Sequence, residues 1–141
     1  MNSVRVLIVD DEEDFATAIA ERLSKRGFRA SAVFSGHEAL RAIKEIEYDA
    51  IVLDLKMPGM DGLQTLQEIR KIDPDVQILV LTGHGTVSAG IGGMQLGAAD
   101  FLQKPLAIEA LSNSIQAAAE QSRVKRSQKK NRDENKAELS L

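Results

Sequence analysis

The chain alternates between short apolar runs rich in Val, Ile and Leu and longer segments in which apolar residues recur about every 3.6 positions. Three of the short runs are almost continuously hydrophobic, which is typical of strands covered on both faces of a sheet. The predicted strands are RVLIVD (5–10), FRASAV (28–33), AIVLDL (50–55), VQILVLT (76–82) and ADFLQ (99–103).

The segments between these runs have the periodicity of amphipathic helices. The first ends at Gly27, because glycine is favoured just past a helix C-terminus. The third ends before Asp73-Pro74, because proline disfavours helix at the residue before it. The apolar positions of the first three segments are Phe15, Ile19 and Leu23; Ala39, Leu40, Ile43 and Ile46; and Leu63, Leu66 and Ile69. The fourth segment covers about 86–96, and the fifth follows Pro105 with Leu106, Ile108, Leu111 and Ile115.

Strict alternation of five strands and five helices predicts an α/β fold, a doubly wound parallel sheet with helices on two faces. The expected strand order is the flavodoxin-like 2-1-3-4-5. In such sheets the site lies beyond the carboxyl ends of the strands, near the point where the strand order reverses. The residues that follow each predicted strand are therefore the candidates for a functional site.

Polar residues gather at these strand ends. Asp10 and Asp11 end the first strand, Asp54 lies at the end of the third, Thr82 ends the fourth and Lys104 follows the fifth. In the 2-1-3-4-5 order these strands are neighbours, so the five side chains are expected to share one pocket.

Three carboxylates in one pocket require a cation, because like charges about 4 Å apart repel by several kcal/mol at intermediate dielectric. Oxygen-only ligation with few carboxylates suits Mg²⁺ that keeps several waters. Phosphoryl transfer needs the same equipment: an in-line nucleophile, a metal and a cation near the phosphoryl oxygens. An aspartate such as Asp54 can be the nucleophile and form an acyl phosphate. Thr82 and Lys104 are placed to hydrogen-bond its phosphoryl oxygens.

Four spaced motifs, VDDEED (9–14), LDLKMPGMDG (53–62), LTGHGT (81–86) and GAADFLQKP (97–105), closely resemble those of two-component receiver domains over about residues 4–120. The resemblance implies a signalling module that promotes its own Mg²⁺-dependent phosphorylation and dephosphorylation and turns over no separate substrate. The resemblance implies that Asp54 is the phosphoacceptor and that Mg²⁺ is bound by Asp10, Asp11, Asp54 and the backbone carbonyl of Lys56. It implies that Thr82 and Lys104 bind the phosphoryl group, and that Thr82 and Phe101 form a switch in which Phe101 turns inward. Lys56 and His84 are implied to tune the rate.

Each of these residues also has a simpler interpretation. The acids at 10 and 11, together with Glu12, Glu13 and Asp14, suit the positive end of a helix dipole, and those last three are assigned to it alone. Asp54 alone could cap a strand end, Thr82 could be an ordinary strand residue and Lys104 an exposed loop lysine. Phe101 could simply belong to the core, and His84 to a loop. The Lys104-Pro105 bond is a candidate cis peptide.

Composition and charge indicate where the protein is located and how the chain is organised. The chain has 141 residues, no cysteine and no apolar run of the roughly 20 residues that span a bilayer, so a cytoplasmic protein is expected. The net charge of −3 is uneven: residues 1–120 carry 11 Lys/Arg against 18 Asp/Glu, and residues 121–141 carry 7 against 3. The predicted organisation is a receiver domain over 1–120 and a basic polar tail over 121–141, either a continuation of the last helix or disordered. An acidic globule is a poor partner for nucleic acid.

The functions open to such a chain differ in their output. As a stand-alone receiver, it would take phosphate from a sensor histidine kinase or a phosphotransfer protein. It would then bind a protein partner, or a second copy of itself, through the face of helix four, strand five and helix five. As the N-terminal part of a DNA-binding transcription regulator, it would control that output instead, and the position of the gene's stop codon separates the two. An aspartate-nucleophile phosphatase would need a second acid where Lys56 stands.

Overall fold

The computed structural model describes residues 3–55, 61–83 and 94–139. Its elements follow the predicted alternation of strands and helices closely. They are β1 (Arg5–Val9), α1 (Glu13–Lys25), β2 (Arg29–Val33), α2 (Gly36–Glu45), β3 (Ala50–Leu53), α3 (Gly62–Ile72), β4 (Gln77–Thr82), β5 (Asp100–Gln103) and α5 (Ile108–Leu139). The helical segment expected over about 86–96 lies mostly outside the described residues.

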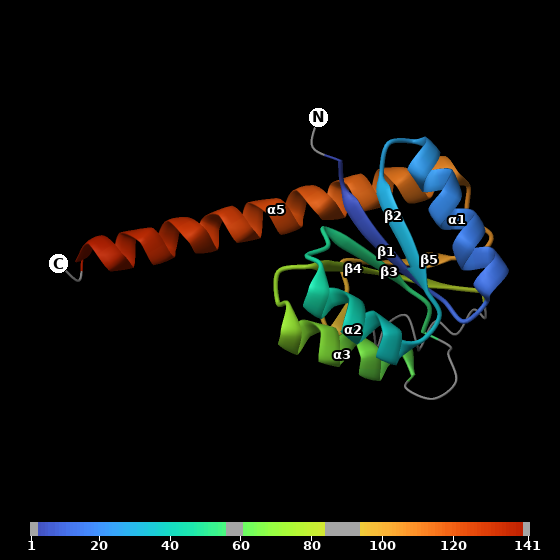
Figure 1. The fold of residues 1–141 in the computed structure, drawn as a ribbon, viewed down its shortest axis with the longest axis horizontal. Helices are drawn as coiled ribbons and strands as arrows, with labels where there is room; N and C mark the ends of the chain where they lie inside the picture. Colours follow the sequence, from blue (N-terminus) through green and yellow to red (C-terminus); the bar gives the residue numbers. More distant parts are fainter. Residues whose placement is uncertain (1–2, 56–60, 84–93, 140–141) are drawn as a thin grey trace.

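The five strands form one parallel sheet in the order β2-β1-β3-β4-β5, which confirms the predicted topology. Helices cover both faces of this sheet, with α1 and α5 on one face and α2 and α3 on the other (Figure 1). The carboxyl ends of β1, β3, β4 and β5 therefore lie along one edge, where the site was expected.

Each face of the sheet has its own hydrophobic core. Along β1, Val6 and Ile8 pack against α1 and α5, while Leu7 and Val9 pack against α2 and α3. All four side chains are buried, because successive residues of a strand point to opposite faces and both faces are covered. This packing holds the residue that follows β1 in a fixed position.

The ends of the helices are set by local side-chain chemistry. Ser35 caps α2 by accepting a hydrogen bond from the Glu38 backbone N–H at 3.1 Å, and Asp61 caps α3 in the same way. Helix α1 is followed by Gly27, whose φ of 95° is in the left-handed region that glycine adopts without strain. These signals explain why the predicted helix boundaries agree well with the observed ones.

Helix α5 passes through residue 120 without a break and projects beyond the body of the domain (Figure 1). Two arginines attach it to the opposite end of the sheet from Asp54. Arg126 donates to the Tyr48 carbonyl at 2.9 Å and to Asp73 Oδ2 at 2.7 Å, and Arg123 pairs with Asp49 at 3.3 Å. Among residues 3–55, 61–83 and 94–139, no helix combines the length and the apolar character that crossing a bilayer would require.

Candidate functional site

Two buried carboxylates lie side by side at the carboxyl edge of the sheet. Asp10 directly follows β1 and is 2% exposed, and Asp54 directly follows β3 and is 5% exposed. The Asp54 N–H donates to the Val9 carbonyl at 2.9 Å and the Asp10 N–H to the Val33 carbonyl at 3.2 Å. The sheet's own hydrogen bonding thus continues through both aspartates and fixes their backbones.

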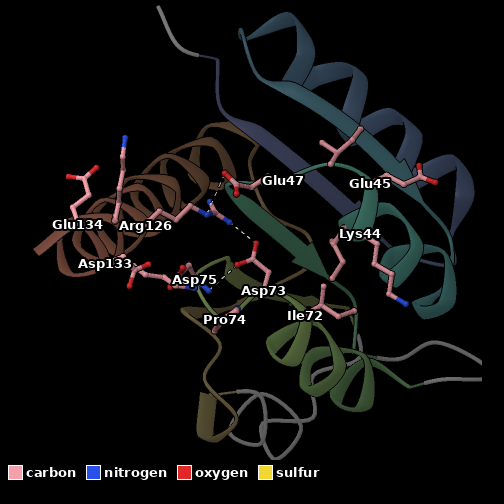
Figure 2. Close-up of a pocket in the computed structure, with 14 residues that line it drawn as sticks. Lys44, Glu45, Glu47, Ile72, Asp73, Pro74, Asp75, Arg126, Asp133 and Glu134 are labelled. Carbon is pink, nitrogen blue, oxygen red and sulfur yellow. Dashed lines mark hydrogen bonds and ion pairs between the residues drawn. The ribbon is translucent and has the colours of Figure 1, made fainter. Parts of the chain in front are cut away.

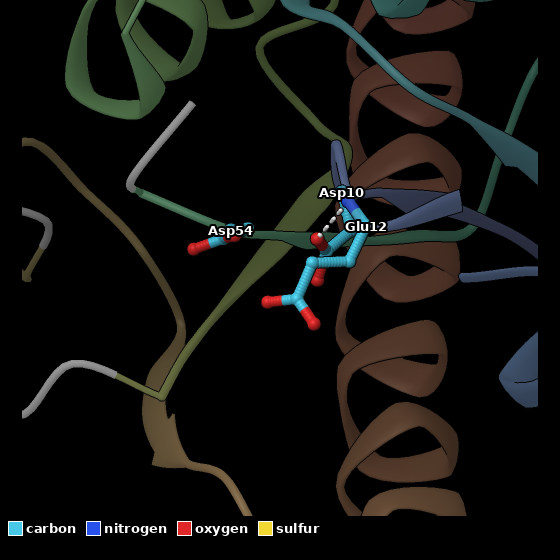
Figure 3. A group of neighbouring side chains, drawn as sticks. All are labelled: Asp10, Glu12 and Asp54. Carbon is cyan, nitrogen blue, oxygen red and sulfur yellow. Dashed lines mark hydrogen bonds between the residues drawn. The ribbon is translucent and has the colours of Figure 1, made fainter. Parts of the chain in front are cut away.

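Glu12 is the third acid of this cluster. One carboxylate oxygen from each of Asp10, Glu12 and Asp54 lies within 4.8 Å of the others, and these three are drawn together in Figure 3. The Glu12 N–H also donates to Asp10 Oδ1 at 2.9 Å. Asp11, the acid expected here from the sequence, is exposed and is not a member of this group.

Glu12 is not among the residues predicted for this site, because an acid next to a helix start also suits the helix dipole. The structure shows why Glu12 joins the cluster, since α1 begins only at Glu13. Residues 10 and 12 therefore lie in the segment before the helix, where side chains two positions apart tend to point to the same side. An acid at every second position before a helix is then expected to contribute to the same pocket.

Lys104 brings the only positive charge that the described residues place among these acids. Its Nζ lies 2.7 Å from Asp10 Oδ2, 3.4 Å from Glu12 Oε1 and 3.9 Å from Asp54 Oδ2, and its side chain is 13% exposed. Nζ also lies 4.2 Å from the centre of the Phe15 ring. Burial by itself lowers the pKa of this ammonium, but the hydrogen bond to Asp10 and the three negative charges outweigh it, so the pKa of Lys104 is raised.

A glycine makes room for the stem of this lysine. A Cβ on Gly83 would lie 3.2 Å from Lys104 Cδ, tighter than most real contacts. Gly83 directly follows β4, whose last residue Thr82 pairs with Gln103 of β5. The Lys104-Pro105 peptide bond is cis, as the sequence analysis anticipated.

Gly62 supports the backbone of the phosphoacceptor candidate from behind. A Cβ at this position would lie 2.2 Å from Leu55 Cα and 2.7 Å from the Asp54 carbonyl oxygen. The Gly62 N–H donates to the Leu55 carbonyl at 3.1 Å. Only glycine permits this close approach of the first residue of α3 to the end of β3.

The remaining predicted residues are placed as follows. Phe101 lies in β5, is half-buried and packs against the core under α2 and α3. The backbone of Thr82 ends β4 next to β5. Lys56 and His84 lie outside the described residues.

Three carboxylates against one ammonium leave the cluster negatively charged. Carboxylate oxygens without nitrogen or sulfur are the donors that Mg²⁺ prefers, and a second cation would relieve the repulsion between Asp10, Glu12 and Asp54. The donor set therefore fits a hard divalent ion. The lysine, held by its acid partners, is positioned to accompany a negatively charged group that enters beside Asp54.

A five-stranded α/β sheet with an acid cluster and a lysine at its carboxyl edge defines a receiver-type signalling domain. The chain belongs to the response regulator receiver domain family, whose model matches residues 6–116. It is similar to the transcriptional regulatory protein PrrA of Mycobacterium leprae, with 38% identity over 83% of this chain and 50% of that protein. It is also similar to the C4-dicarboxylate transport transcriptional regulatory protein DctD of Rhizobium meliloti, with 35% identity over 84% of this chain and 26% of that protein.

Solved structures show the same fold. A response regulator receiver domain protein from Clostridium thermocellum superposes with a TM-score of 0.81 and 32% identity, over 86% of this chain and 98% of that one. By contrast, the chain spans about half or a quarter of the length of the two curated relatives. The similarity to those regulators therefore concerns their receiver portion.

Proposed function

We propose that this domain is a phosphorylation switch in which Asp54 accepts a phosphoryl group from a phosphohistidine of a sensor histidine kinase or phosphotransfer protein. The observation that supports this most directly is the approach of Asp10, Glu12, Lys104 and Asp54 at one sheet edge. These residues come from distant parts of the chain, and a structural role alone would not require buried like charges to meet.

In the proposed reaction, an Asp54 carboxylate oxygen attacks the phosphorus, and the bond from phosphorus to the donor's imidazole nitrogen breaks. The electron pair of that bond stays on the donor nitrogen, which takes a proton from water, so the products are an acyl phosphate on Asp54 and a neutral imidazole on the donor. Lys104, already 3.9 Å from Asp54 Oδ2, shifts toward a phosphoryl oxygen, and the Thr82 hydroxyl donates to another. Its raised pKa keeps Lys104 protonated, and so charged, throughout the neutral range.

A Mg²⁺ ion fits the donor set and would supply positive charge for the phosphoryl oxygens during transfer. In this proposal Asp10 and Asp54 hold it, with Asp11 and the Lys56 carbonyl as the family resemblance implies. Glu12 is a further candidate, because its carboxylate belongs to the cluster and that of Asp11 does not. Calorimetric titration of Mg²⁺ into Asp11→Asn and Glu12→Gln separates the two, because the variant that lacks a true ligand binds more weakly.

Labelling with acetyl phosphate tests the phosphoacceptor. The intact mass of the wild-type chain should rise by one phosphoryl group in the presence of Mg²⁺ and should stay unchanged with a chelator. Asp54→Asn should remain unlabelled, and Asp133→Asn, an exposed acid on α5, should be labelled like the wild type. Labelling of Asp54→Asn at the wild-type level would refute the assignment.

Phosphorylation is proposed to act by a population shift. As Thr82 and Lys104 move toward the phosphoryl group, the half-buried Phe101 repacks and changes the face that includes β5 and α5. The result is a changed affinity for a partner protein or a second copy of the domain. Isotope-labelled protein with and without the acyl-phosphate mimic beryllofluoride should show the largest amide shifts on this face.

DNA-binding output is the second candidate, favoured by the regulators that the chain resembles. In that arrangement this domain controls an output domain that a longer coding sequence supplies. Sequencing the gene beyond codon 141 tests it, because a reading frame that continues into a helix-turn-helix segment supports this output and an immediate stop codon refutes it.

A further inference from the structure

Four arginines gather at the amino edge of the sheet, far from the acid cluster. Arg5 begins β1 and Arg29 begins β2, and the two are direct partners in the parallel register. Together with Arg123 and Arg126 of α5, they line a pocket of about 540 Å³. The other lining residues are Ser3, Glu47 and Asp49.

The acids near this pocket are committed to the helix arginines. Arg126 lies 2.7 Å from Asp73 and 3.6 Å from Glu47, which Figure 2 draws beside it in the neighbouring pocket. It also lies 3.9 Å from Asp49. Arg123 pairs with Asp49 at 3.3 Å. Arg126 Nη1 is buried and has no hydrogen-bond acceptor among residues 3–55, 61–83 and 94–139.

The two strand arginines have no such compensation. Within the described part of the chain, neither the Arg5 nor the Arg29 side chain forms a hydrogen bond or an ion pair. Paired strands lie about 4.8 Å apart, so two like charges start from neighbouring backbone positions and repel. The pocket lining therefore carries four guanidinium groups against the two carboxylates of Glu47 and Asp49, and this excess of positive charge attracts an anion.

We propose that this arginine pocket, defined by Arg5, Arg29, Arg123 and Arg126, binds the phosphate group of a small phosphorylated molecule. Guanidinium groups donate paired hydrogen bonds that match phosphate oxygens, and a phosphate dianion offers enough oxygens to contact both the strand arginines and the helix arginines. The volume of about 540 Å³ exceeds what a phosphate ion alone would fill, so it admits the rest of a phosphomonoester.

The arginine pocket is separate from the phosphoacceptor site. Arg5 and Asp10 stand at opposite ends of β1, which places their backbones about 16 Å apart at the usual rise per strand residue. An anion in the pocket bridges β1 and β2 to the part of α5 that leads out of the domain body. Its expected effect is to hold that part of α5 more firmly against the sheet.

The test uses the full chain in buffer without Mg²⁺, titrated with inorganic phosphate, with glycerol phosphate, or with sodium chloride at matched ionic strength. Backbone amide signals at residues 4–6 and 29–31 should shift with saturation for a phosphate-bearing ligand and not with chloride. Shifts by both phosphates identify the group itself as the ligand, and shifts by one alone identify the free or the esterified form. If neither phosphate shifts them, or all three titrants do so equally, the proposal is overturned.

Arg29→Gln is the informative variant, because its side chain has no partner whose loss would unfold the domain. It should bind at least about tenfold more weakly, the loss expected for one charge-assisted contact. Without phosphate it should be as stable as the wild type or more so, since one like charge is gone. The same phosphate concentration should raise the melting temperature of the wild type more than that of Arg29→Gln. Arg41→Gln, an exposed arginine on α2, should behave as the wild type. Undiminished binding by Arg29→Gln would overturn the proposal.

Discussion

The contacts of Arg126 indicate that the folded domain extends along α5 at least as far as this residue. The residue lies beyond the 6–116 region matched by the family model, yet its guanidinium donates to Tyr48 O and to Asp73 Oδ2 in two different loops. Arg126→Ala removes both hydrogen bonds and leaves the Asp73 carboxylate without the guanidinium that pairs with it. We therefore expect the substitution to destabilise the whole domain and not only the projecting end of the helix.

The structure allows an estimate of this loss. The Arg126 and Asp73 side chains are 18% and 22% exposed, so the pair is largely but not fully withdrawn from water. Breaking a fully buried pair costs about 3–5 kcal/mol, and an exposed pair about 0–1 kcal/mol. We expect a loss of about 2 kcal/mol, in the lower part of the range between these cases. The value is low because the substitution also removes the buried Nη1, which lacks an acceptor in the described structure. For a domain of this size it corresponds to a fall of roughly 6–8 °C in Tm.

Thermal and urea unfolding followed by far-UV circular dichroism measure the effect, since the chain has no tryptophan. Phosphate-free buffer keeps anion binding out of the comparison. Arg132→Ala, an exposed arginine further along α5, is the matched control and should change Tm by about 1 °C or less. A melting temperature for Arg126→Ala equal to that of the control would show that the contacts of Arg126 add nothing to the stability of the domain.

Three further results are expected at the site itself. Gly62→Ala should lower stability by about 1–3 kcal/mol in urea unfolding, because the added Cβ meets Leu55 Cα at 2.2 Å; an unchanged midpoint would contradict this. Asp61→Ala should cost about 1 kcal/mol by loss of the α3 cap, and Asp61→Ser should recover most of it. Because the pKa of Lys104 is raised in the folded state above its ordinary value of 10.5, its contribution is complete below that value and is lost as pH rises through the folded pKa. Unfolding free energies between about pH 9 and pH 11.5 should therefore fall more steeply for the wild type than for Lys104→Met, and parallel curves would refute the link to Asp10.

The strands and most helix ends could be predicted because their causes are local. The run AIVLDL predicted a strand over 50–55, and the observed β3 ends at Leu53, with Asp54 directly after it. Helix α3 ends at Ile72 just before Asp73-Pro74, as the proline required. These features depend on residues within a few positions of each other, which a single sequence displays.

What the sequence did not reveal depends on distant contacts. The attachment of Arg126 to Asp73 joins residues 53 positions apart, and the tail read on its own showed only a basic helix-forming composition. Glu12 was assigned to the helix dipole, because the first residue of α1 and the place of Lys104 opposite the acids are known only from the structure. Pairing of the two arginines that begin β1 and β2 needs the register, which periodicity alone does not give.

The distances around Lys104 also indicate an order of events at the site. Its ammonium is bonded to Asp10 at 2.7 Å and stands 3.9 Å from Asp54, so it serves first as the counter-ion of Asp10. Lys104 can leave that carboxylate for a phosphoryl oxygen only if another cation neutralises Asp10, since a buried unpaired charge costs several kcal/mol. Binding of a divalent cation and movement of Lys104 should therefore be coupled, with the lysine signal in an NMR titration shifting as Mg²⁺ is added before any phosphodonor is present. A Lys104 signal that stays unchanged until phosphorylation would mean that the lysine reaches the phosphoryl group without giving up Asp10.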